Sequence, residues 1–246
     1  MRRSQMNDTT RLAYFDCASG ASGEMFLGAL VAAGLLEADL RDVLAPLQRA
    51  GAAFELSVRP AQKGPVEATL VRLGGQAADV RATLPDMLEL IGAADLGAEV
   101  ESRTAAVLRR LAAASAQVAG ERPDDHVFAG TSGVDTVVAA VGVVGGLALL
   151  RVNEVMSSPV NLGAHDPVVA ALLAAAPTYA DSPGLPLVTP LGAALLAELV
   201  SEWPASPPFA GGQVGYGAGE RDLPRPNVMR CFLGYGTIGP PQHAPT

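Results

Sequence analysis

Residues 11–34 read RLAYFDCASGASGEMFLGALVAAG, and this stretch decides which fold is expected. Its first seven residues, 11–17, are mostly apolar and predict a short buried strand. A loop of small residues follows, and Ser22 is a favoured N-cap for a helix whose apolar residues recur at helical spacing until Gly34. A strand, a small-residue loop and a helix in this order indicate a mixed α and β architecture.

The remainder of the chain alternates strands and helices irregularly. An apolar run from Thr136 to Leu150 is too short to span a bilayer comfortably, so we expect a buried helix that begins at Ser132 with Asp135 in a capping box. Residues 214–219, VGYGAG, are typical of a turn. Further strands are expected at 53–59, 66–73, 152–156, 159–162 and 228–234, and further helices at 37–49, 84–92, 97–119, 167–175 and 190–202.

These elements predict an α/β or α+β fold with a mixed sheet, packed helices and no transmembrane segment. The 246 residues suit one large domain or two small, tightly packed ones. We therefore expect one domain over 11–235, divisible into subdomains at about 11–120 and 121–235. Residues 236–246, rich in Pro and Gly, are expected to form a flexible tail.

Composition and charge narrow the class of protein. The formal net charge of −8 argues against nucleic-acid binding, which needs clustered Lys and Arg. Polar residues 4–10 follow the basic start, which argues against an export signal and for a cytoplasmic location. In that compartment Cys17 and Cys231 are expected to remain free thiols.

The first candidate site is the loop between Asp16 and Glu24. Backbone N–H groups and hydroxyls at the start of a helix suit an anion, and a carboxylate at each edge suits a metal ion or a proton. The alternative is a tight turn with an N-cap, in which Asp16 binds loop amides. The loop lacks the spacing of a P-loop, so the residues alone leave both interpretations open.

The second candidate groups Asp124, Asp125, His126 and Asp135, because carboxylates and an imidazole close in sequence suit a divalent metal. On spacing alone, helix capping by Asp135 and a solvated loop at Asp124 and Asp125 are the favoured explanation of the carboxylates. His165 follows later in the chain and is either a ligand or a surface residue.

The third candidate is the segment 216–227, in which Gly217 and Gly219 permit close approach of backbone to a ligand. Arg221 or Arg225 would meet a phosphate or a carboxylate. The alternative is a hairpin-like connection with an Arg–Asp surface pair.

Five segments, taken together and in this order, resemble the N-terminal region of the LarC family of nickel insertion proteins. The first and last of them are long enough to be specific, and the resemblance extends over about residues 11–235. The segments are DCASGASGEMFLGAL (16–30), VDT (134–136), SPVNLG (158–163), VTPLGAALL (188–196) and YGAGERDLPRPN (216–227).

The resemblance implies a role in making the nickel-pincer cofactor of lactate racemase and related enzymes. That family inserts nickel into pyridinium bisthiocarboxylic acid mononucleotide with CTP hydrolysis, a lyase or metallochelatase type of reaction. Carried over, it implies catalytic roles for Asp16 and Asp135. It also implies nickel ligation by Asp16, Glu24, His126 and His165, and mononucleotide contacts from Ser19, Gly20, Ser22, Gly23, Thr189, Gly217, Gly219, Arg221 and Asn227.

The chain also departs from the family pattern. A segment that is His-rich in the family reads QAADV at 76–80, and Glu24 stands where the family has Asp. The family's H-F-H-E run is reduced to one histidine, His126, and a family segment is missing around His165. The resemblance ends near residue 235, so we expect CTP and its divalent metal to be held by a separate C-terminal subunit.

Three interpretations follow from the matches and the departures. One is a nickel insertion component that works with that subunit, and another is a non-catalytic paralogue with a binding or regulatory role. The third is an unrelated small-molecule or phosphate-binding enzyme that shares only the loops. The family also suggests a homo-oligomer.

Overall fold

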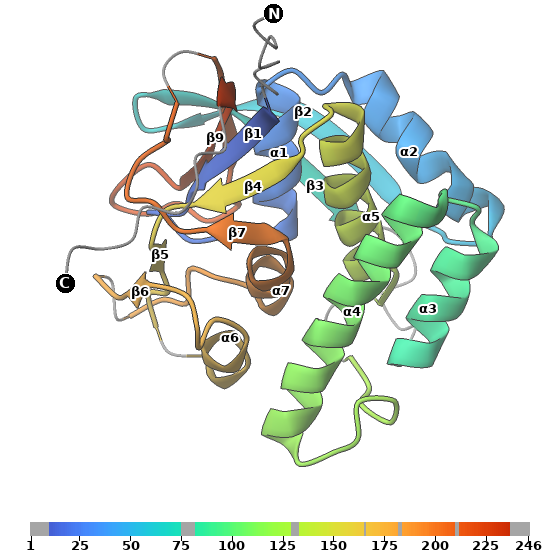
Figure 1. Ribbon diagram of the computed structural model, residues 1–246. Helices are drawn as coiled ribbons and strands as arrows, with labels where there is room; N and C mark the ends of the chain where they lie inside the picture. The colour runs from blue at the N-terminus through green and yellow to red at the C-terminus, as the bar shows by residue number, and fades with distance from the viewer. Residues whose placement is uncertain are drawn as a thin grey trace, which may run out of the picture.

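The computed structural model describes residues 10–74, 82–128, 133–164, 166–181, 184–209 and 212–236. Its centre is a mixed seven-stranded sheet in the order β2-β3-β8-β9-β1-β4-β7, which confirms the expected α/β class (Figure 1). β1 is parallel to β4 and antiparallel to β9. The strands are β1 (Thr10–Asp16), β2 (Glu55–Lys63), β3 (Val66–Gly74), β4 (Glu154–Ser157), β7 (Val200–Glu202), β8 (Gln213–Ala218) and β9 (Val228–Gly236), with β5 (Val160–Asn161) and β6 (Thr178–Tyr179) paired separately.

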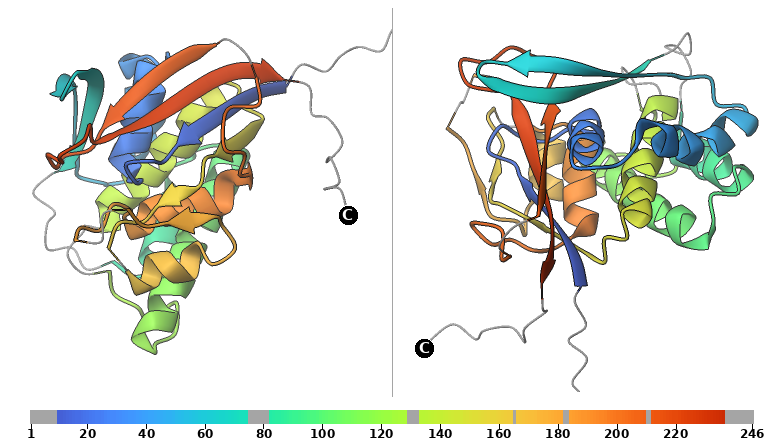
Figure 2. Two further views of the ribbon diagram at one scale, coloured as in Figure 1. Left: turned by 90° about the vertical axis from the view of Figure 1, so that its left-hand side faces the viewer. Right: turned by 90° about the horizontal axis from the view of Figure 1, so that it is seen from above.

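The helices gather on one side of this sheet, which twists so strongly that the β2–β3 hairpin runs across the direction of β1 and β9 (Figure 2). They are α1 (Gly23–Ala32), α2 (Glu37–Arg49), α3 (Leu84–Ala93), α4 (Ala98–Ala119), α5 (Gly133–Leu149), α6 (Pro167–Leu172) and α7 (Pro190–Leu199). Across the described ranges, none of the helices combines the length and hydropathy needed to cross a membrane.

β1 separates the interior into two parts because successive side chains of a strand point to opposite faces. Ala13 and Phe15 face the main core between the sheet and the helices. Leu12 and Tyr14 face the other side, where they form a small cluster with Met156. The strand expected from the apolar run at 11–17 is thus buried on both faces.

Residues 214–219 do not form the predicted turn, because 213–218 are the interior strand β8. The glycines that suggested a turn let α1 lie directly on the sheet. A Cβ atom on Gly217 would overlap the Met25 carbonyl oxygen, and one on Gly215 would overlap that of Ala29. From the other side, a Cβ atom on Gly28 would overlap the Thr69 carbonyl oxygen of β3.

α5 is the buried helix expected from the apolar run, and nearly all of its residues are shielded from water. Glycines let its neighbours approach closely. A Cβ atom on Gly142 would lie 2.9 Å from Leu27, and one on Gly146 would lie 2.9 Å from Leu35. The central helix is therefore held by α1 and by the segment that follows it.

Two helix ends were predicted too far along the chain. The helix expected at 190–202 ends at Leu199, and 200–202 form β7, which pairs in parallel with β4. The helix expected at 167–175 ends at Leu172. In both cases apolar residues continue past the end of the helix. After α7 the chain pairs with β4, whereas after α6 it makes a local turn, with a hydrogen bond from the Ala176 N–H to the Leu173 carbonyl, before Pro177.

Several expectations concern residues outside the described ranges: the segment QAADV at 76–80, the capping residue Ser132 and the tail after 236. The division into two subdomains stays a prediction. The central sheet contains strands from both expected subdomains, since β1, from the first, lies between β9 and β4, from the second.

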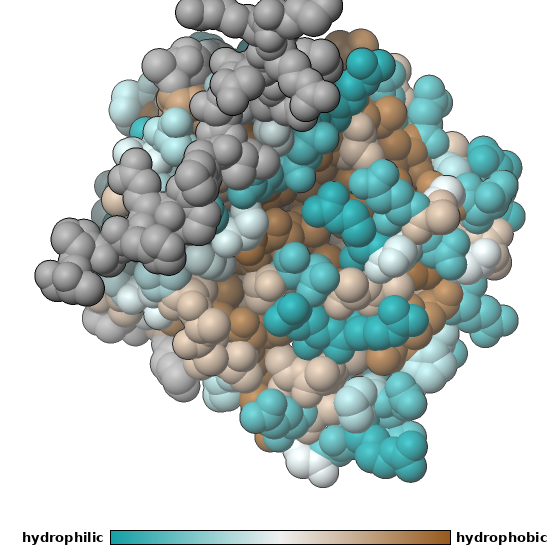
Figure 3. Space-filling view, viewed as in Figure 1, coloured by the Kyte–Doolittle hydropathy of each residue, from teal (hydrophilic) through white to brown (hydrophobic). Residues whose placement is uncertain are grey.

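Hydrophilic and apolar side chains alternate over the helices on the face shown in Figure 3. Charged residues make up only 17% of the chain, so apolar atoms remain at the surface between them.

Candidate functional site

Two neighbouring cavities share part of their walls. The first, which we call the helical cavity, has a volume of about 270 Å³ and lies among α1, α4, α5 and α7. It is lined by Gly23, Glu24, Leu111, Ser115, His126, Phe128, Asp135, Thr136, Ala139, Thr189, Pro190 and Leu191. Three of its polar side chains, those of Glu24, His126 and Asp135, can bind a cation or exchange a proton.

The second, which we call the loop cavity, has a volume of about 360 Å³. It lies beside the segment that joins β8 to β9 and is lined by Ser22, Glu24, Met25, Asp166, Pro186, Leu187, Val188, Thr189, Pro190, Ala218, Gly219, Glu220, Arg221, Leu223 and Asn227. Glu24, Thr189 and Pro190 line both cavities, so a ligand that extends from one to the other passes these residues.

Three helices begin at the helical cavity. Glu24 is in the first turn of α1, Asp135 is in the first turn of α5, and Thr189 is the N-cap of α7. A helix N-terminus carries partial positive charge, which stabilises an ionised carboxylate. Two carboxylates thus line one cavity from the starts of helices, and together they attract a cation.

A short parallel pairing joins the start of α1 to the start of α7. The Ala21 N–H donates to the Leu187 carbonyl over 3.1 Å, and the Thr189 N–H donates to the Ala21 carbonyl over 2.9 Å. Gly20 has a φ of +88°, and a Cβ atom there would overlap the Leu187 carbonyl oxygen. The glycine at this position thus permits both the turn and the close approach.

Asp16 lies away from both cavities. Its carboxylate accepts a hydrogen bond of 3.0 Å from the Ala18 N–H and pairs with the Arg230 guanidinium from the neighbouring strand. Only 16% of its side chain is exposed. This is the loop-binding role that was the alternative to a metal or catalytic role.

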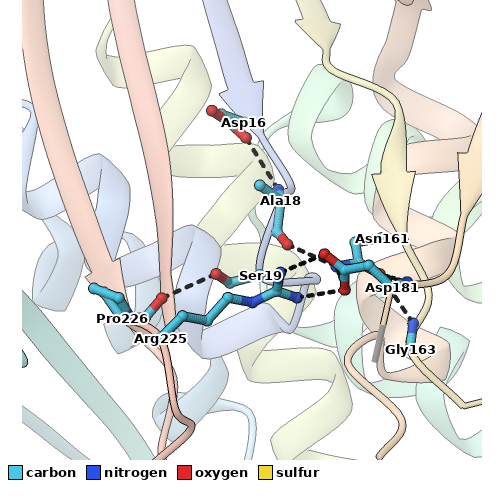
Figure 4. Close-up of polar contacts among 8 residues, drawn as sticks. All are labelled: Asp16, Ala18, Ser19, Asn161, Gly163, Asp181, Arg225 and Pro226. Carbon is cyan, nitrogen blue, oxygen red and sulfur yellow. Dashed lines mark hydrogen bonds and ion pairs between the residues drawn. The ribbon is translucent and has the colours of Figure 1, made fainter. Parts of the chain in front are cut away.

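The loop after Asp16 is tied to distant segments by a network that we call the loop junction, made of residues 16–19, Asn161, Asp181 and Arg225 (Figure 4). Asn161 donates to the Ala18 carbonyl over 2.9 Å and to Asp181 over 2.7 Å. Arg225 grips the Asp181 carboxylate with two hydrogen bonds, of 2.5 and 2.9 Å.

Ser19 belongs to the same junction. It is buried, and its hydroxyl donates to the Pro226 carbonyl over 2.9 Å (Figure 4). The loop junction is therefore a structural joint between β1 and the segment that precedes β9.

The two cysteine thiols near this joint are buried, which makes them unreactive. Cys17 and Cys231 are both fully buried and free, as predicted. Burial raises the pKa of the Cys17 thiol to about 12, with a weaker opposing effect from its hydrogen bond to Ser157. Burial also raises the pKa of Cys231. Neither thiol is suited to act as a nucleophile or as a metal-binding thiolate.

The segment that carries Arg221 is held in place by hydrogen bonds from Lys63 and Asn227. Only 10% of the Lys63 side chain is exposed. Its ammonium donates to the Glu220 carbonyl over 3.2 Å, to the Arg221 carbonyl over 3.3 Å and to the Asp222 carboxylate over 2.9 Å. Asn227 donates to the same Arg221 carbonyl over 3.0 Å. The Arg221 side chain donates to the Pro186 carbonyl over 3.0 Å at the edge of the loop cavity.

The structure brings some of the predicted residues together and separates others. Ser22, Gly23, Glu24, His126, Asp135, Thr189, Gly219, Arg221 and Asn227 line one or both cavities. Asp16, Ser19, Gly20 and Gly217 line neither cavity and serve loop structure or packing. His165 lies outside the described residues. The Arg–Asp pair expected within 216–227 is replaced by the pairs of Arg225 with Asp181 and of Asp222 with Lys63.

Four residues of the site were missed from the sequence: Lys63, Glu121, Asp166 and Glu220. Only Asp166 carried a local signal, since Asp before Pro is a typical helix start, and it caps α6. In the described part of the chain, no three His, Cys, Asp or Glu side chains stand ready as a metal-binding group. The protein groups in the helical cavity would thus supply only part of a coordination shell.

The chain matches known proteins over most of its length. A family model described as nickel insertion protein matches residues 13–245. A protein of Roseiflexus castenholzii is 37% identical over 238 residues, which are 91% of this chain and 59% of the relative. A pyridinium-3,5-bisthiocarboxylic acid mononucleotide nickel insertion protein of a Nocardioides species is 36% identical over 238 residues, covering 90% of this chain and 59% of the relative.

A protein with the same name from Desulfitobacterium hafniense is 33% identical over 236 residues, covering 91% of this chain and 58% of the relative. The chain thus spans less than two thirds of the length of these relatives. No solved structure matches it.

Proposed function

This chain belongs to the nickel insertion protein family, and from this premise we propose that it takes part in making the nickel-pincer cofactor. In this proposal it binds pyridinium bisthiocarboxylic acid mononucleotide and directs Ni²⁺ onto it, both as substrates. A separate C-terminal part supplies the CTP-binding site and its divalent metal. The domain boundaries at 11 and 235 belong to the same proposal.

The observation that supports this function best is the shared wall of the two cavities. A ligand with an anionic phosphate at one end and a metal-binding ring at the other needs two different environments within reach of each other. The loop cavity offers Arg221 and the starts of α1 and α7, which suit a phosphate. The helical cavity offers carboxylates and an imidazole, which suit a divalent metal.

In this arrangement Glu24 is the central residue, because it lines both cavities. Its carboxylate makes no hydrogen bond or ion pair with another described residue, so it is available to a cation. Asp135 contributes a second carboxylate, which can hold the metal or accept a proton from the ligand ring. We propose Glu24, His126 and Asp135 as the protein groups nearest to the metal.

The limited number of protein ligands suits a transfer role. A metal that must leave the protein on its substrate is better held by a few groups than enclosed by four. The mononucleotide, as its name states, carries two thiocarboxylic acid groups, and sulfur is a soft donor. We therefore expect Ni²⁺ to bind weakly to the protein alone and more tightly once the mononucleotide is present.

The same observation supports a second candidate, a non-catalytic relative that binds the mononucleotide and has a regulatory or scaffolding role. It is supported by the finding that, among the described residues, no three His, Cys, Asp or Glu side chains are placed to hold a metal ion. The two candidates differ in one respect. The non-catalytic protein would bind the mononucleotide without gaining affinity for Ni²⁺.

Calorimetry with the purified protein tests both candidates. The mononucleotide is titrated first, and Ni²⁺ is then titrated with and without it. We expect mononucleotide binding that Arg221→Gln weakens about tenfold or more, because a charged hydrogen bond contributes about 1.5–3 kcal/mol. We also expect mononucleotide-dependent Ni²⁺ binding that Glu24→Gln weakens.

Two variants outside the cavities serve as matched controls. Arg59→Gln removes an exposed guanidinium from β2, and Glu99→Gln removes an exposed first-turn carboxylate from α4. Both controls should bind like the unaltered protein. Failure of the folded protein to bind the mononucleotide would overturn the proposed function, and binding of the mononucleotide with no change in Ni²⁺ affinity would favour the non-catalytic candidate.

A further inference from the structure

His126 is held by two neighbours, Glu121, which lies outside the helical cavity, and Phe128, which lines it. Its Nδ1 lies 2.8 Å from an oxygen of the Glu121 carboxylate. Its ring meets the edge of Phe128, with the ring centres 4.9 Å apart and the planes at 89°. The backbone of Phe128 is fixed in turn by a 3.1 Å hydrogen bond to the Ala82 carbonyl. The imidazole is thus oriented, with 19% of its side chain exposed.

Glu121 owes its position to the end of α4. Gly120 adopts the left-handed conformation, with a φ of +71°, and its N–H donates to the Ala116 carbonyl. The Glu121 N–H donates to the same carbonyl over 2.9 Å. This is a common way for a helix to end, and it places the next side chain in a defined direction. Glu121 does not line the cavity, whereas His126 does.

The chemistry of this contact determines which nitrogen carries the proton. An ionised carboxylate only accepts hydrogen bonds, so Nδ1 must donate. In the neutral imidazole, Nε2 then keeps its lone pair. No described residue hydrogen-bonds Nε2, and His126 lines the cavity together with Glu24 and Asp135.

We propose that Glu121 is a positioning residue for the metal-handling site. It fixes His126 in the Nδ1–H tautomer, so that Nε2 presents its lone pair to the helical cavity and can ligate Ni²⁺. The metal-binding part of this inference rests on the proposed function, while the tautomer does not. Carboxylate partners behind metal-binding histidines act in this way in many sites, and their removal weakens metal binding about 10- to 100-fold.

The tautomer can be read directly from the ring nitrogens by long-range proton–nitrogen NMR of histidine-labelled protein. The chain has three histidines, and a His126→Gln variant assigns the relevant signals. At about pH 8, where an ordinary imidazole is neutral, we expect the Nδ1–H form in the unaltered protein. Glu121→Ala should convert it mainly to the Nε2–H form. Glu121→Gln should keep part of the Nδ1–H form, because its amide oxygen still accepts.

Glu99→Gln is the control and should leave the tautomer unchanged. In parallel, the dissociation constant for Ni²⁺ alone should rise about tenfold or more in Glu121→Ala and less in Glu121→Gln. An Nε2–H signal in the unaltered protein, or a tautomer that does not respond to Glu121→Ala, overturns the inference. A tautomer that responds while no protein binds Ni²⁺, even with the mononucleotide present, supports the positioning role and contradicts the proposed function.

Discussion

The loop junction and the helical cavity begin within the same few residues, yet their polar groups are used differently. In the junction, Asp16, Ser19 and Asn161 each have partners within the fold. In the cavity, the Glu24 carboxylate and the Nε2 of His126 have none among the described residues. One sequence motif can therefore contain residues that hold the fold around a site and residues whose side chains are available to a ligand. The two groups differ in whether their polar atoms already have hydrogen-bond partners within the protein.

The largest expected effect belongs to Gly20, which follows the loop junction and packs against the Leu187 carbonyl. Gly20→Ala should lower the free energy of unfolding by about 3 kcal/mol or more, because a strained backbone and a backbone overlap add together. Gly51→Ala is the matched control, since Gly51 also has a positive φ, of +100°, but has open space around it. It should lose only about 1–2 kcal/mol of strain.

Urea denaturation measures both variants. Equal losses in Gly20→Ala and Gly51→Ala would show that the close approach to Leu187 adds nothing, and the pairing between the starts of α1 and α7 would then not be tight.

Alkaline pH should affect the joint through its buried thiols. Burial raises the pKa of Cys17 to about 12 from an ordinary value of 9.0. A raised pKa in the fold gives stability that is present below the unfolded value and is lost as the pH rises toward the folded value. The protein should therefore lose stability between about pH 9 and about pH 12.

The double variant Cys17→Ala, Cys231→Ala should show a flatter dependence, followed by urea denaturation at several pH values. Tyr14 leaves a residual slope, since burial and Asp16 raise its pKa to about 12. An unchanged slope in the double variant would mean that the thiols ionise freely in the folded protein.

Arg225 and Arg221 lie in one segment and allow a direct comparison, because Arg225 pairs within the fold and Arg221 lines the loop cavity. Arg225→Gln breaks the double hydrogen bond to Asp181 and should lower the free energy of unfolding by about 1 kcal/mol. Arg221→Gln should change it by less than about 0.5 kcal/mol, because only an exposed bond to Pro186 is lost. For mononucleotide affinity the order should reverse, with the larger loss in Arg221→Gln.

Denaturation and calorimetry on the same two samples decide the matter. If both variants lose stability and mononucleotide affinity in equal proportion, the segment acts as one unit. Arg225 would then not be separable from Arg221 as a residue that stabilises the fold rather than binding the ligand.

Local signals in the sequence were sufficient for the elements that local chemistry determines. Ser22 was predicted as the N-cap of α1, and its hydroxyl accepts the Met25 N–H over 3.2 Å. The helix at 37–49 was predicted with the bounds that the structure shows. Caps and apolar periodicity involve neighbours in the chain, so a single sequence is enough to predict them.

Packing between distant segments could not be predicted in this way. Gly215 and Gly217 have the local signature of a turn, and only the approach of α1 explains them within a strand. The partner of Arg225 lies 44 residues away at Asp181. The candidate metal ligands were likewise chosen by residue type, and no local pattern placed Asp16 outside the cavity that Glu24 lines.

The smallest expected effect is also the most informative about the cavity. Glu24 and Glu99 both occupy the first turn of a helix, where a carboxylate gains about 0.3–1 kcal/mol from the helix dipole. Glu99→Gln should lose this amount together with its pair to Arg103, one turn along the helix. Glu24→Gln should lose only the dipole contribution, because Glu24 makes no ion pair with another described residue. The two variants should differ most when Ni²⁺ is present in excess, because Glu24 lines the helical cavity and Glu99 does not. Ni²⁺ should then stabilise the unaltered protein and Glu99→Gln more than Glu24→Gln, as measured by urea denaturation. If Ni²⁺ stabilises all three proteins equally, Glu24 is not among the groups that hold the cation.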